Sequence, residues 1–475
     1  MKYKIIEGLI ALVLLLVFFS LRTYRLDYPL ADWHSYRQAD TASVARNFYK
    51  DGINLLYPQS DSLLALSQNQ LPNPNRYFIN EFPLYNATVA LLYQQFGVHE
   101  WLGRMVSIVV STFGALALYL LMRSLFHPIV AIFTLLLYTF NPYQAYYSRV
   151  FMPDPSFVSF SIIALYFNHL YVTRKSLLFQ FLYILAIALA TLIKPYAVFI
   201  YLPIVYWQVI NLRWGFFKPL NLLGLIVSTI PLVLWRYHVS LHPEGQFASQ
   251  WLLNGGNIRF TGAFFRWIIF ERFNRLIFAT GGFVLFMLGV FASTRSKAGK
   301  FLLVWLISIL AYITIFAKGN VTHDYYQLPI VPIGIALAAI GGLYQISRSR
   351  SFDQLLSNLF LVSVLSVLMV SFGWFEVRGY FNVNRWEIIQ AGKRVDELTP
   401  KDSLVIAPYM GDPAFLYHTN RHGWTIGGDI TLLQKQGASI YVSVNYDDEA
   451  NRLLKQYQTI EANDRYLILD LTKPL

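Results

Sequence analysis

Long apolar runs recur along this chain, and short polar turns separate most of them. Because an α-helix rises 1.5 Å per residue, about 20 apolar residues are needed to cross the roughly 30 Å hydrocarbon core of a bilayer. The pattern predicts a polytopic α-helical membrane protein with about eleven spans. The expected spans are residues 5–22, 104–126, 128–146, 155–173, 177–194, 196–212, 219–236, 275–294, 300–317, 328–346 and 355–375.

The first apolar run follows a basic start, as in a signal peptide. No small-residue cleavage site follows the run, so we expect it to be an uncleaved first span. A large polar loop comes next, at residues 23–83. Within this loop, the spacing of apolar residues predicts one helix on the membrane surface over residues 39–49, and residues 83–96 predict a second.

The last hundred residues have no long apolar run. A helical pattern covers residues 386–398, and strand-like patterns follow at 403–407, 439–444 and 466–471. We therefore expect a membrane domain at residues 1–375 and a small soluble α/β domain at residues 376–475.

Composition and charge agree with this picture. Hydrophobic residues make up 56% of the chain and charged residues 13%, which is too apolar for a soluble protein of this length. The net charge is +12, but the basic residues lie in short turns, which argues against a nucleic-acid partner. With the N-terminus in the cytoplasm, every cytoplasmic turn contains Lys or Arg, as the positive-inside rule requires. The loop 23–83 and the C-terminal domain then lie on the outer face.

Cofactor chemistry is restricted by the lack of cysteine. Disulfides, Cys-ligated zinc or iron–sulfur sites and a thiol nucleophile are excluded, and no nucleotide-binding glycine motif appears. A divalent metal is compatible with the oxygen and nitrogen ligands present, although no spacing among them is diagnostic. These ligands are Asp32, His34, Asp40, Glu81, Asp154, His323 and Asp324.

The first loop contains the strongest candidates for catalysis. Asp32 and Asp40 lie eight residues apart, with His34, Arg37 and Gln38 between them. A carboxylate here can act as a general base on an acceptor hydroxyl or amine, and the basic residues can bind phosphate. The alternative is that both acids are solvated or cap a helix, as Asp40 before a helical stretch would do.

Further polar residues lie near the ends of the spans. Glu81 lies at the end of the first loop. It is a further candidate acid, a candidate metal ligand or the partner of Arg76 in an interfacial salt bridge. Asp154 is functional if it faces a cavity, and Lys194 either binds a lipid phosphate or, as we slightly favour, extends to the headgroups. The run His323, Asp324, Tyr325 and Tyr326 starts a span, where each polar group needs a partner.

Five stretches in order along the chain resemble a known group of enzymes: residues 37–48, 80–85, 96–107, 152–155 and 325–329. Their pattern is similar to that of GT-C superfamily membrane glycosyltransferases. The group in question is family 39 and its Rgt-like relatives, which include lipid A aminoarabinose transferases and protein O-mannosyltransferases. The resemblance covers roughly residues 1–350 and implies a GT-C fold.

The resemblance also implies a reaction. Such enzymes take a sugar from a polyprenyl-phosphate carrier at the outer leaflet, a first-loop acid deprotonates the acceptor, and cations hold the lipid phosphate. We expect Asp40 or Asp32 to be the catalytic base. The expected substrate-binding residues are His34, Arg37, Gln38, Glu81, Arg104, Asp154, Lys194, His323, Asp324, Tyr325 and Tyr326.

Two positions depart from the aminoarabinose-transferase pattern. Arg37-Gln38 stands where that pattern has an Asp-Glu pair, so the base must lie elsewhere. Phe82 stands where those enzymes carry a Lys near the donor phosphate, so Arg37, Lys194 or an Arg of residues 236–275 would supply that charge.

The sequence thus predicts a glycosyltransferase of a bacterial inner membrane that uses a polyprenyl-phosphate-linked sugar. Its acceptor is a glycolipid such as lipopolysaccharide, a polysaccharide or a protein of the cell envelope, and the C-terminal domain is expected to cap the site or help to choose that acceptor. The alternatives are a transporter or flippase for lipid-linked sugars and a noncatalytic partner subunit with the same fold.

Overall fold

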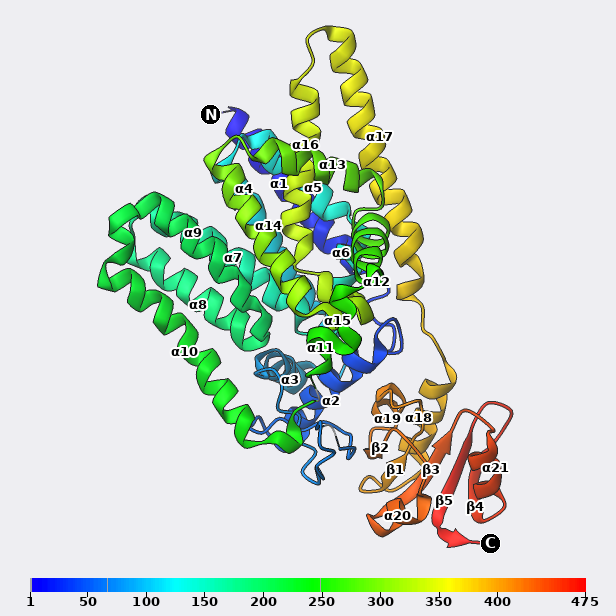
Figure 1. Ribbon diagram of the computed structural model, residues 1–475. Helices are drawn as coiled ribbons and strands as arrows, with labels where there is room; N and C mark the ends of the chain where they lie inside the picture. The colour runs from blue at the N-terminus through cyan, green and yellow to red at the C-terminus, as the bar shows by residue number, and fades with distance from the viewer. Residues whose placement is uncertain (1, 66, 248) are drawn as a thin grey trace. The chain divides into compact units, whose positions relative to one another are not determined.

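The computed structural model describes residues 2–65, 67–247 and 249–475 (Figure 1). The chain forms two compact units, each built from segments that are far apart in the sequence. The first unit comprises Met1–Leu26, Met105–Arg236 and Ser249–Gly379. The second comprises Asp27–Arg104, Tyr237–Ala248 and Tyr380–Leu475, so the large first loop belongs to the same unit as the C-terminal region.

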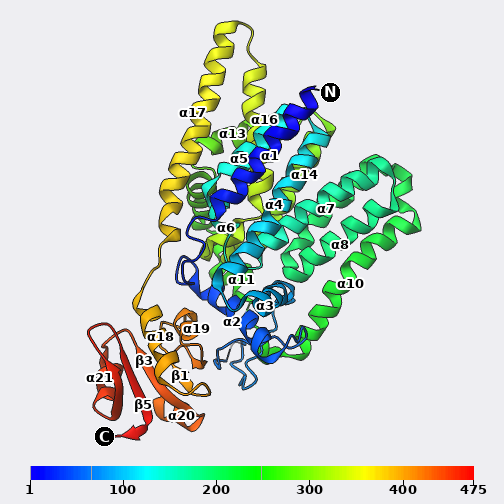
Figure 2. The ribbon, with the colours of Figure 1, turned by 180° about the vertical axis from the view of Figure 1, so that it is seen from behind.

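The first unit is helical. Its elements, some of which extend into the second unit, are α1 (Lys2–Arg22), α4 (Glu100–Leu125), α5 (Pro128–Phe140), α6 (Pro142–Tyr147), α7 (Asp154–Arg174), α8 (Leu177–Ile193), η1 (Pro195–Ile200), α9 (Tyr201–Leu212), η2 (Arg213–Phe217), α10 (Pro219–Leu241), α11 (Trp251–Asn254), η4 (Gly255–Phe260), α12 (Gly262–Phe265), η5 (Arg266–Ile277), α13 (Gly281–Ser293), α14 (Lys297–Ile315), α15 (Ala317–Thr322), η6 (Asp324–Gln327), α16 (Ile330–Ser347) and α17 (Phe352–Val377). Figures 1 and 2 show α16 and α17 as a long hairpin, and α7 and α8 as a neighbouring pair.

The helices confirm a multi-pass membrane protein. In the described ranges, eight helices are long and apolar enough to cross a bilayer. The expected span at 275–294 falls on a pair of helices, Gly262–Ile277 and Gly281–Ser293, that bend by 113° at their junction. The remaining two expected spans correspond to the shorter apolar helices Pro128–Phe140 and Leu177–Ile193. All eleven predicted runs are therefore helical, although three are shorter or bent.

Helices α13 and α16 lie unusually close together because glycines face each other's backbone. A Cβ added to Gly341 would lie 2.0 Å from the carbonyl oxygen of Leu285, and one added to Gly289 would lie 1.8 Å from that of Leu337. Small residues at such crossings let two membrane helices approach until their backbones touch. This contact fixes α16, which continues from the segment at residues 323–329.

The first loop supplies two helices to the second unit, α2 (Ser35–Asp51) and α3 (Leu84–Phe96), so both expected helices are confirmed. The expectation that the first lies on the membrane surface with one covered face does not match the burial, because every residue from Ser35 to Phe48 except Tyr36 is buried. Helix α3 and the C-terminal helix α19 (Ala414–His418) both contact α2.

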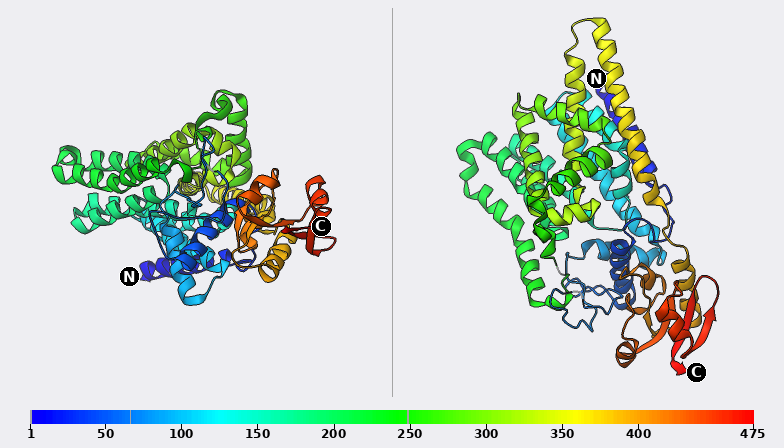
Figure 3. Two further views of the ribbon diagram at one scale, coloured as in Figure 1. Left: turned by 90° about the horizontal axis from the view of Figure 1, so that it is seen from below. Right: turned by 45° about the vertical axis from the view of Figure 1, so that its right-hand side comes forward.

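The C-terminal region forms a five-stranded sheet in the order β2-β1-β3-β5-β4, which confirms the small α/β domain. Strands β1, β2 and β3 are parallel, whereas β5 is antiparallel to both of its neighbours. The strands are β1 (Leu404–Ile406), β2 (His422–Trp424), β3 (Ala438–Ser443), β4 (Tyr457–Ala462) and β5 (Leu467–Pro474). Besides α19, its helices are α18 (Glu387–Leu398), α20 (Ile430–Lys435) and α21 (Asp448–Leu454), all visible in Figure 3 in orange to red.

The first loop joins this sheet at its β2 edge. Ser62 forms a bridge with Gly423, where the Leu63 amide donates to Gly423 O at 2.7 Å and the Gly423 amide donates to Asp61 O at 3.0 Å. Gly423 has a φ of 155°, and a Cβ there would lie 1.8 Å from Val405 O, so only glycine fits. The loop thereby covers backbone groups that a free edge would expose.

Candidate functional site

Helix α2 carries the acids and cations of the first loop. The helix begins at Ser35, after His34, whose φ of 58° turns the chain sharply. Asp40 therefore lies in the second turn and does not cap the helix, so the capping alternative is wrong. His34 is partly exposed, and its ring lies between those of Trp33 and Tyr36, with centroids 5.1 and 5.7 Å away.

The Asp40 carboxylate is buried but has no hydrogen-bonding or ion-pair partner in the described structure. Within the described part of the chain, its side chain makes no hydrogen bond or ion pair, although the residue is only 8% exposed. Burial raises the pKa of Asp40 to about 8, and the carboxylates of Asp412, Asp61 and Glu81 add to this effect. Arg37, one turn earlier on α2, acts in the opposite direction. A carboxyl with such a pKa is suited to exchange protons near neutral pH.

Asp32 belongs to a buried network of hydrogen bonds and an ion pair. Gln38 donates through Nε2 to Asp32 Oδ1 at 2.6 Å, and Arg104 Nη2 lies 3.5 Å from Asp32 Oδ2. Gln38 also donates to Trp33 O at 3.0 Å, and Arg104 donates to Tyr28 O. Asp32, Gln38 and Arg104 are at most 1% exposed. These three residues therefore hold the chain before α2 in place.

Glu81 pairs with a cation beside Asp40. The distance from Arg37 Nη2 to Glu81 Oε1 is 2.6 Å, and the Arg37 guanidinium lies 5.7 Å from the centre of the Phe78 ring. Arg76 instead donates to Ser60 O at 2.8 Å. The suggested pairing of Glu81 with Arg76 is thus wrong, and Glu81 orients Arg37 at the first turn of α2.

The C-terminal domain contributes an acid that the sequence did not single out. Ser35 Oγ donates to Asp412 Oδ2 at 2.8 Å, and the Ala414 amide donates to Asp412 Oδ1 at 2.8 Å. Burial raises the pKa of Asp412 as well. The only local signal is a turn sequence, Gly411-Asp412-Pro413, and nothing in it reveals contact with α2, hundreds of residues earlier.

A buried arginine of α2 pairs with Asp61 and hydrogen-bonds to α19. Arg46 Nη2 lies 2.5 Å from Asp61 Oδ2, and Arg46 Nη1 donates to Tyr417 O at 2.9 Å. Burial lowers the pKa of the neighbouring His418 to about 4, so this ring is neutral at physiological pH. We assign these residues to structure because their polar groups serve the contact between the two helices.

In the first unit, Lys194 forms an ion pair with Asp154. Lys194 Nζ lies 3.4 Å from Asp154 Oδ1, and both side chains are 5% exposed. Lys194 therefore does not extend to the headgroups, and the preferred expectation for it is wrong. Asp154 Oδ2 is buried and accepts no hydrogen bond in the described structure. The pair joins the first turn of α7 to the end of α8.

The run from His323 to Tyr326 is engaged by partners, as expected for polar groups at the start of a span. Tyr147 donates to Asp324 Oδ1 at 2.5 Å, and Arg272 Nη1 lies 3.9 Å from Asp324 Oδ2. The rings of Tyr325 and Tyr326 stack with centroids 4.7 Å apart, and the His323 ring stacks on Tyr325 at 5.5 Å.

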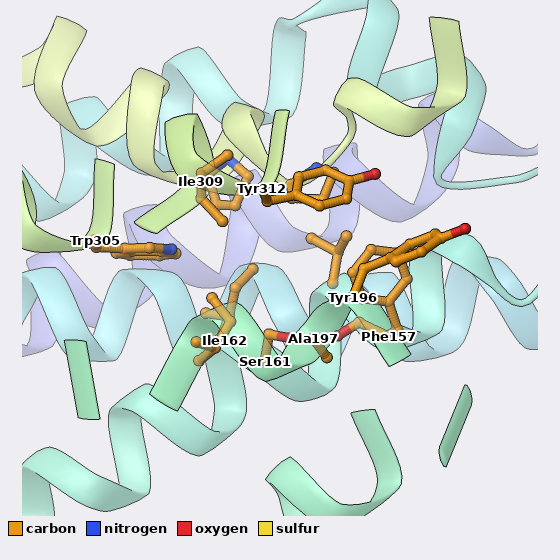
Figure 4. Close-up of a pocket in the computed structure, with 12 residues that line it drawn as sticks. Phe157, Ser161, Ile162, Tyr196, Ala197, Trp305, Ile309 and Tyr312 are labelled. Carbon is orange, nitrogen blue, oxygen red and sulfur yellow. Dashed lines mark hydrogen bonds between the residues drawn. The ribbon is translucent and has the colours of Figure 1, made fainter. Parts of the chain in front are cut away.

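A small apolar cavity of about 10 Å³ lies in the same unit, between α7, η1, α14 and the start of α16. Figure 4 shows Trp305 at one end and the rings of Tyr196 and Tyr312 at the other, with their hydroxyls directed the same way. Aliphatic and aromatic residues such as Phe157, Ile162 and Ile309 form its walls. A space of this size is close to that of one water molecule, so these residues form a packed apolar core in this structure.

Comparisons with known proteins agree with this architecture. Residues 80–237 match the sequence model of a family described as dolichyl-phosphate-mannose-protein mannosyltransferase. ArnT from Cupriavidus metallidurans, solved with bound undecaprenyl phosphate, superimposes with a TM-score of 0.67 at 16% identity, over 98% of each chain. The chain has the GT-C fold.

A second GT-C structure supports the same assignment. The Archaeoglobus fulgidus oligosaccharyltransferase, solved with Zn and sulfate, matches with a TM-score of 0.64 at 11% identity, over 91% of this chain and 67% of that one. None of the curated protein sequences matches the chain. The family and structural matches thus confirm the expected resemblance and the GT-C architecture.

In this GT-C protein the predicted site residues fall into two groups. Asp32, His34, Arg37, Gln38, Asp40, Glu81 and Arg104 lie in the second unit, and Asp154, Lys194, His323, Asp324, Tyr325 and Tyr326 lie in the first. No three His, Asp or Glu side chains converge as metal ligands among the residues that the structure describes. The arrangement therefore offers acid–base and charge chemistry from Asp40 and Arg37, with no assembled metal site in the described residues.

Proposed function

We propose that this GT-C protein transfers a glycosyl residue from a polyprenyl-phosphate-linked sugar to an acceptor of the cell envelope. The acceptor is a glycolipid, polysaccharide or protein, and the reaction takes place at the outer face of a bacterial inner membrane. The observation that carries the proposal is the buried, uncommitted Asp40 carboxylate one turn from Arg37. The lipid phosphate bound to ArnT supports the class of donor.

Asp40 is the proposed general base. An acceptor O–H or N–H gives its proton to the Asp40 carboxylate while its oxygen or nitrogen attacks C1 of the sugar. The bond from C1 to the phosphate oxygen breaks, the electron pair leaves with the polyprenyl phosphate, and the configuration at C1 inverts. The high pKa of Asp40 makes it a stronger base than an ordinary carboxylate. Asp32 is less suitable because Gln38 and Arg104 already occupy both of its oxygens.

Positive charge near the leaving group is the second requirement. Negative charge accumulates on the departing phosphate, and a fixed cation stabilises it without reorganising. Arg37 meets this need because Glu81 holds its guanidinium beside the base. Lys194 stays a proposed substrate-binding residue of the first unit, where Asp154 Oδ1 lies 3.4 Å from its ammonium nitrogen.

Purified protein tests the proposal directly. Sugar transfer would be measured from a mixed pool of polyprenyl-phosphate sugars to envelope acceptors, with wild type, Asp40→Asn, Asp32→Asn and the exposed control Asp464→Asn. Loss of transfer in Asp40→Asn with normal transfer in Asp464→Asn is the expected result. Binding of the donor by wild type without any transfer would contradict the enzyme and favour a flippase or a noncatalytic subunit.

A further inference from the structure

A second cavity lies in the first loop, in the same unit as Asp40. Its volume is about 250 Å³, and its wall contains six side chains with hydrogen-bonding groups that meet at the C-terminal end of α2. These are Asn47, Asp51, Asn54, Tyr57, Gln59 and Tyr77. Nothing in the proposed chemistry at Asp40 uses these residues.

The chemistry of this wall selects a class of ligand. It offers one carboxylate and three amides, which can hydrogen-bond to neighbouring hydroxyl groups, and two tyrosine rings, which give an apolar face. The rings of Tyr57 and Tyr77 lie 5.5 Å apart and are tilted by 39°. None of the eight described lining residues is Lys or Arg, so the cavity does not suit phosphate. A neutral polyhydroxylated ring satisfies both kinds of surface.

Asn47 carries a buried hydrogen-bond acceptor that has no donor in the described structure. Its side chain is 2% exposed, and Nδ2 donates to Gln59 O at 3.1 Å and to Asp61 Oδ1 at 3.2 Å. Its Oδ1 is buried and accepts no hydrogen bond in the described structure. A buried acceptor without a donor costs free energy, so the hydrogen-bonding capacity of this residue beside the cavity is not fully used.

Helix geometry relates this cavity to the proposed base. Asn47 follows Asp40 by seven residues and Asp51 follows it by eleven, so at 3.6 residues per turn all three lie on the same side of α2. The rise of 1.5 Å per residue puts Asn47 about 10 Å along the axis from Asp40. One or two sugar rings have this length.

We propose that this cavity binds a neutral saccharide portion of the acceptor, which is thereby a glycan or glycolipid rather than a bare peptide. The inference rests on the proposed transfer reaction and names its acceptor class. Asp51, Asn54, Tyr57 and Tyr77 contact the sugar, and the attacking hydroxyl belongs to a ring one or two residues away, at Asp40.

Equilibrium binding tests the site without requiring catalysis. Saturation-transfer NMR on the full-length protein in detergent would use glucose, galactose, mannose and N-acetylglucosamine and their di- and trisaccharides. Wild type and the control Asp464→Asn should bind at least one of these, and Asp51→Asn and Asn54→Ala should bind it roughly tenfold more weakly. Asp51 is exposed at the end of its helix, so its substitution leaves the fold intact. Equal binding by all four proteins, or no binding by wild type, would overturn the proposal.

Transfer kinetics separate this inference from the proposed reaction. In Asp51→Asn the KM for a glycan acceptor should rise about tenfold while kcat and the KM for the donor stay unchanged, whereas Asp40→Asn should lose kcat. If Asp40→Asn loses transfer but Asp51→Asn keeps the acceptor KM, the saccharide site is refuted and the reaction stands. If wild type transfers nothing yet binds saccharides through Asp51, the reaction fails and the binding site stands.

Discussion

The pH dependence of transfer tests the role of Asp40 most sharply. A base must be ionised, and burial raises the pKa of Asp40 to about 8. Roughly one tenth of the enzyme is then competent at pH 7 and roughly nine tenths at pH 9. We therefore expect kcat/KM to rise about ninefold over this range and to level off above it. Asp40→Asn should lower the plateau at least 100-fold, which is the lower end of typical general-base effects.

The assay would follow transfer of a radiolabelled sugar at subsaturating donor between pH 5.5 and 9.5. Thermal unfolding of Asp40→Asn provides the control for folding. The folded protein binds the Asp40 proton more tightly than the unfolded chain, so between about pH 4 and 8 this group costs stability as pH rises. Asp40→Asn should thus be at least as stable as wild type at pH 9. A profile that is flat from pH 6 to 9, or a variant with half of the wild-type rate, would refute the assignment.

Three further predictions follow from the described contacts. Asp412→Asn removes a carboxylate that raises the pKa of Asp40, so the midpoint of the pH profile should move to lower pH by less than about one unit, and an unmoved midpoint would contradict the coupling. Arg37→Lys keeps the charge but loses the planar fork that pairs with Glu81, so kcat should fall about 10- to 100-fold with equal protein folding, and full activity would exclude Arg37 from the leaving-group site. Gly341→Ala forces a methyl group against Leu285 O and should cost about 1–3 kcal/mol in detergent unfolding, whereas Gly8→Ala, with no atom within 4 Å of the new methyl, should match wild type.

The sequence predicted the elements that depend on local pattern. Transmembrane helices need a continuous apolar run, and α2, α3, α18 and three of the five strands show their periodicity directly. Strand β2 was missed because it has only three residues and one of them is Gly423. Strand β4 was missed because its alternation is weak and most of its side chains are exposed or half-buried. Short or exposed strands are defined by their neighbours more than by their own residues.

The residues of the candidate site also fall into those predicted from local sequence and those that depend on distant contacts. Residue type and position in the first loop predicted Asp40 and Asp32 as candidate bases without ranking them, and their role stays a prediction. The ranking depends on Gln38 and Arg104, which occupy Asp32 and leave Asp40 uncommitted. Asp412 and the true partner of Glu81 depend on contacts across 377 and 44 residues, respectively. No local periodicity encodes contacts of such separation, because tertiary packing determines them.

The bridge between Ser62 and Gly423 has a consequence for biosynthesis. Its two residues are separated by about 360 residues of chain, so at 5–20 residues per second the loop emerges roughly 20–70 s before its partner. During that interval helix α2 has no α19 to cover it, and Arg46 and Asp61 have no Tyr417 beside them. The first loop must therefore stay soluble and unaggregated until translation is almost finished, and the unit that carries Asp40 is among the last parts of the protein to mature.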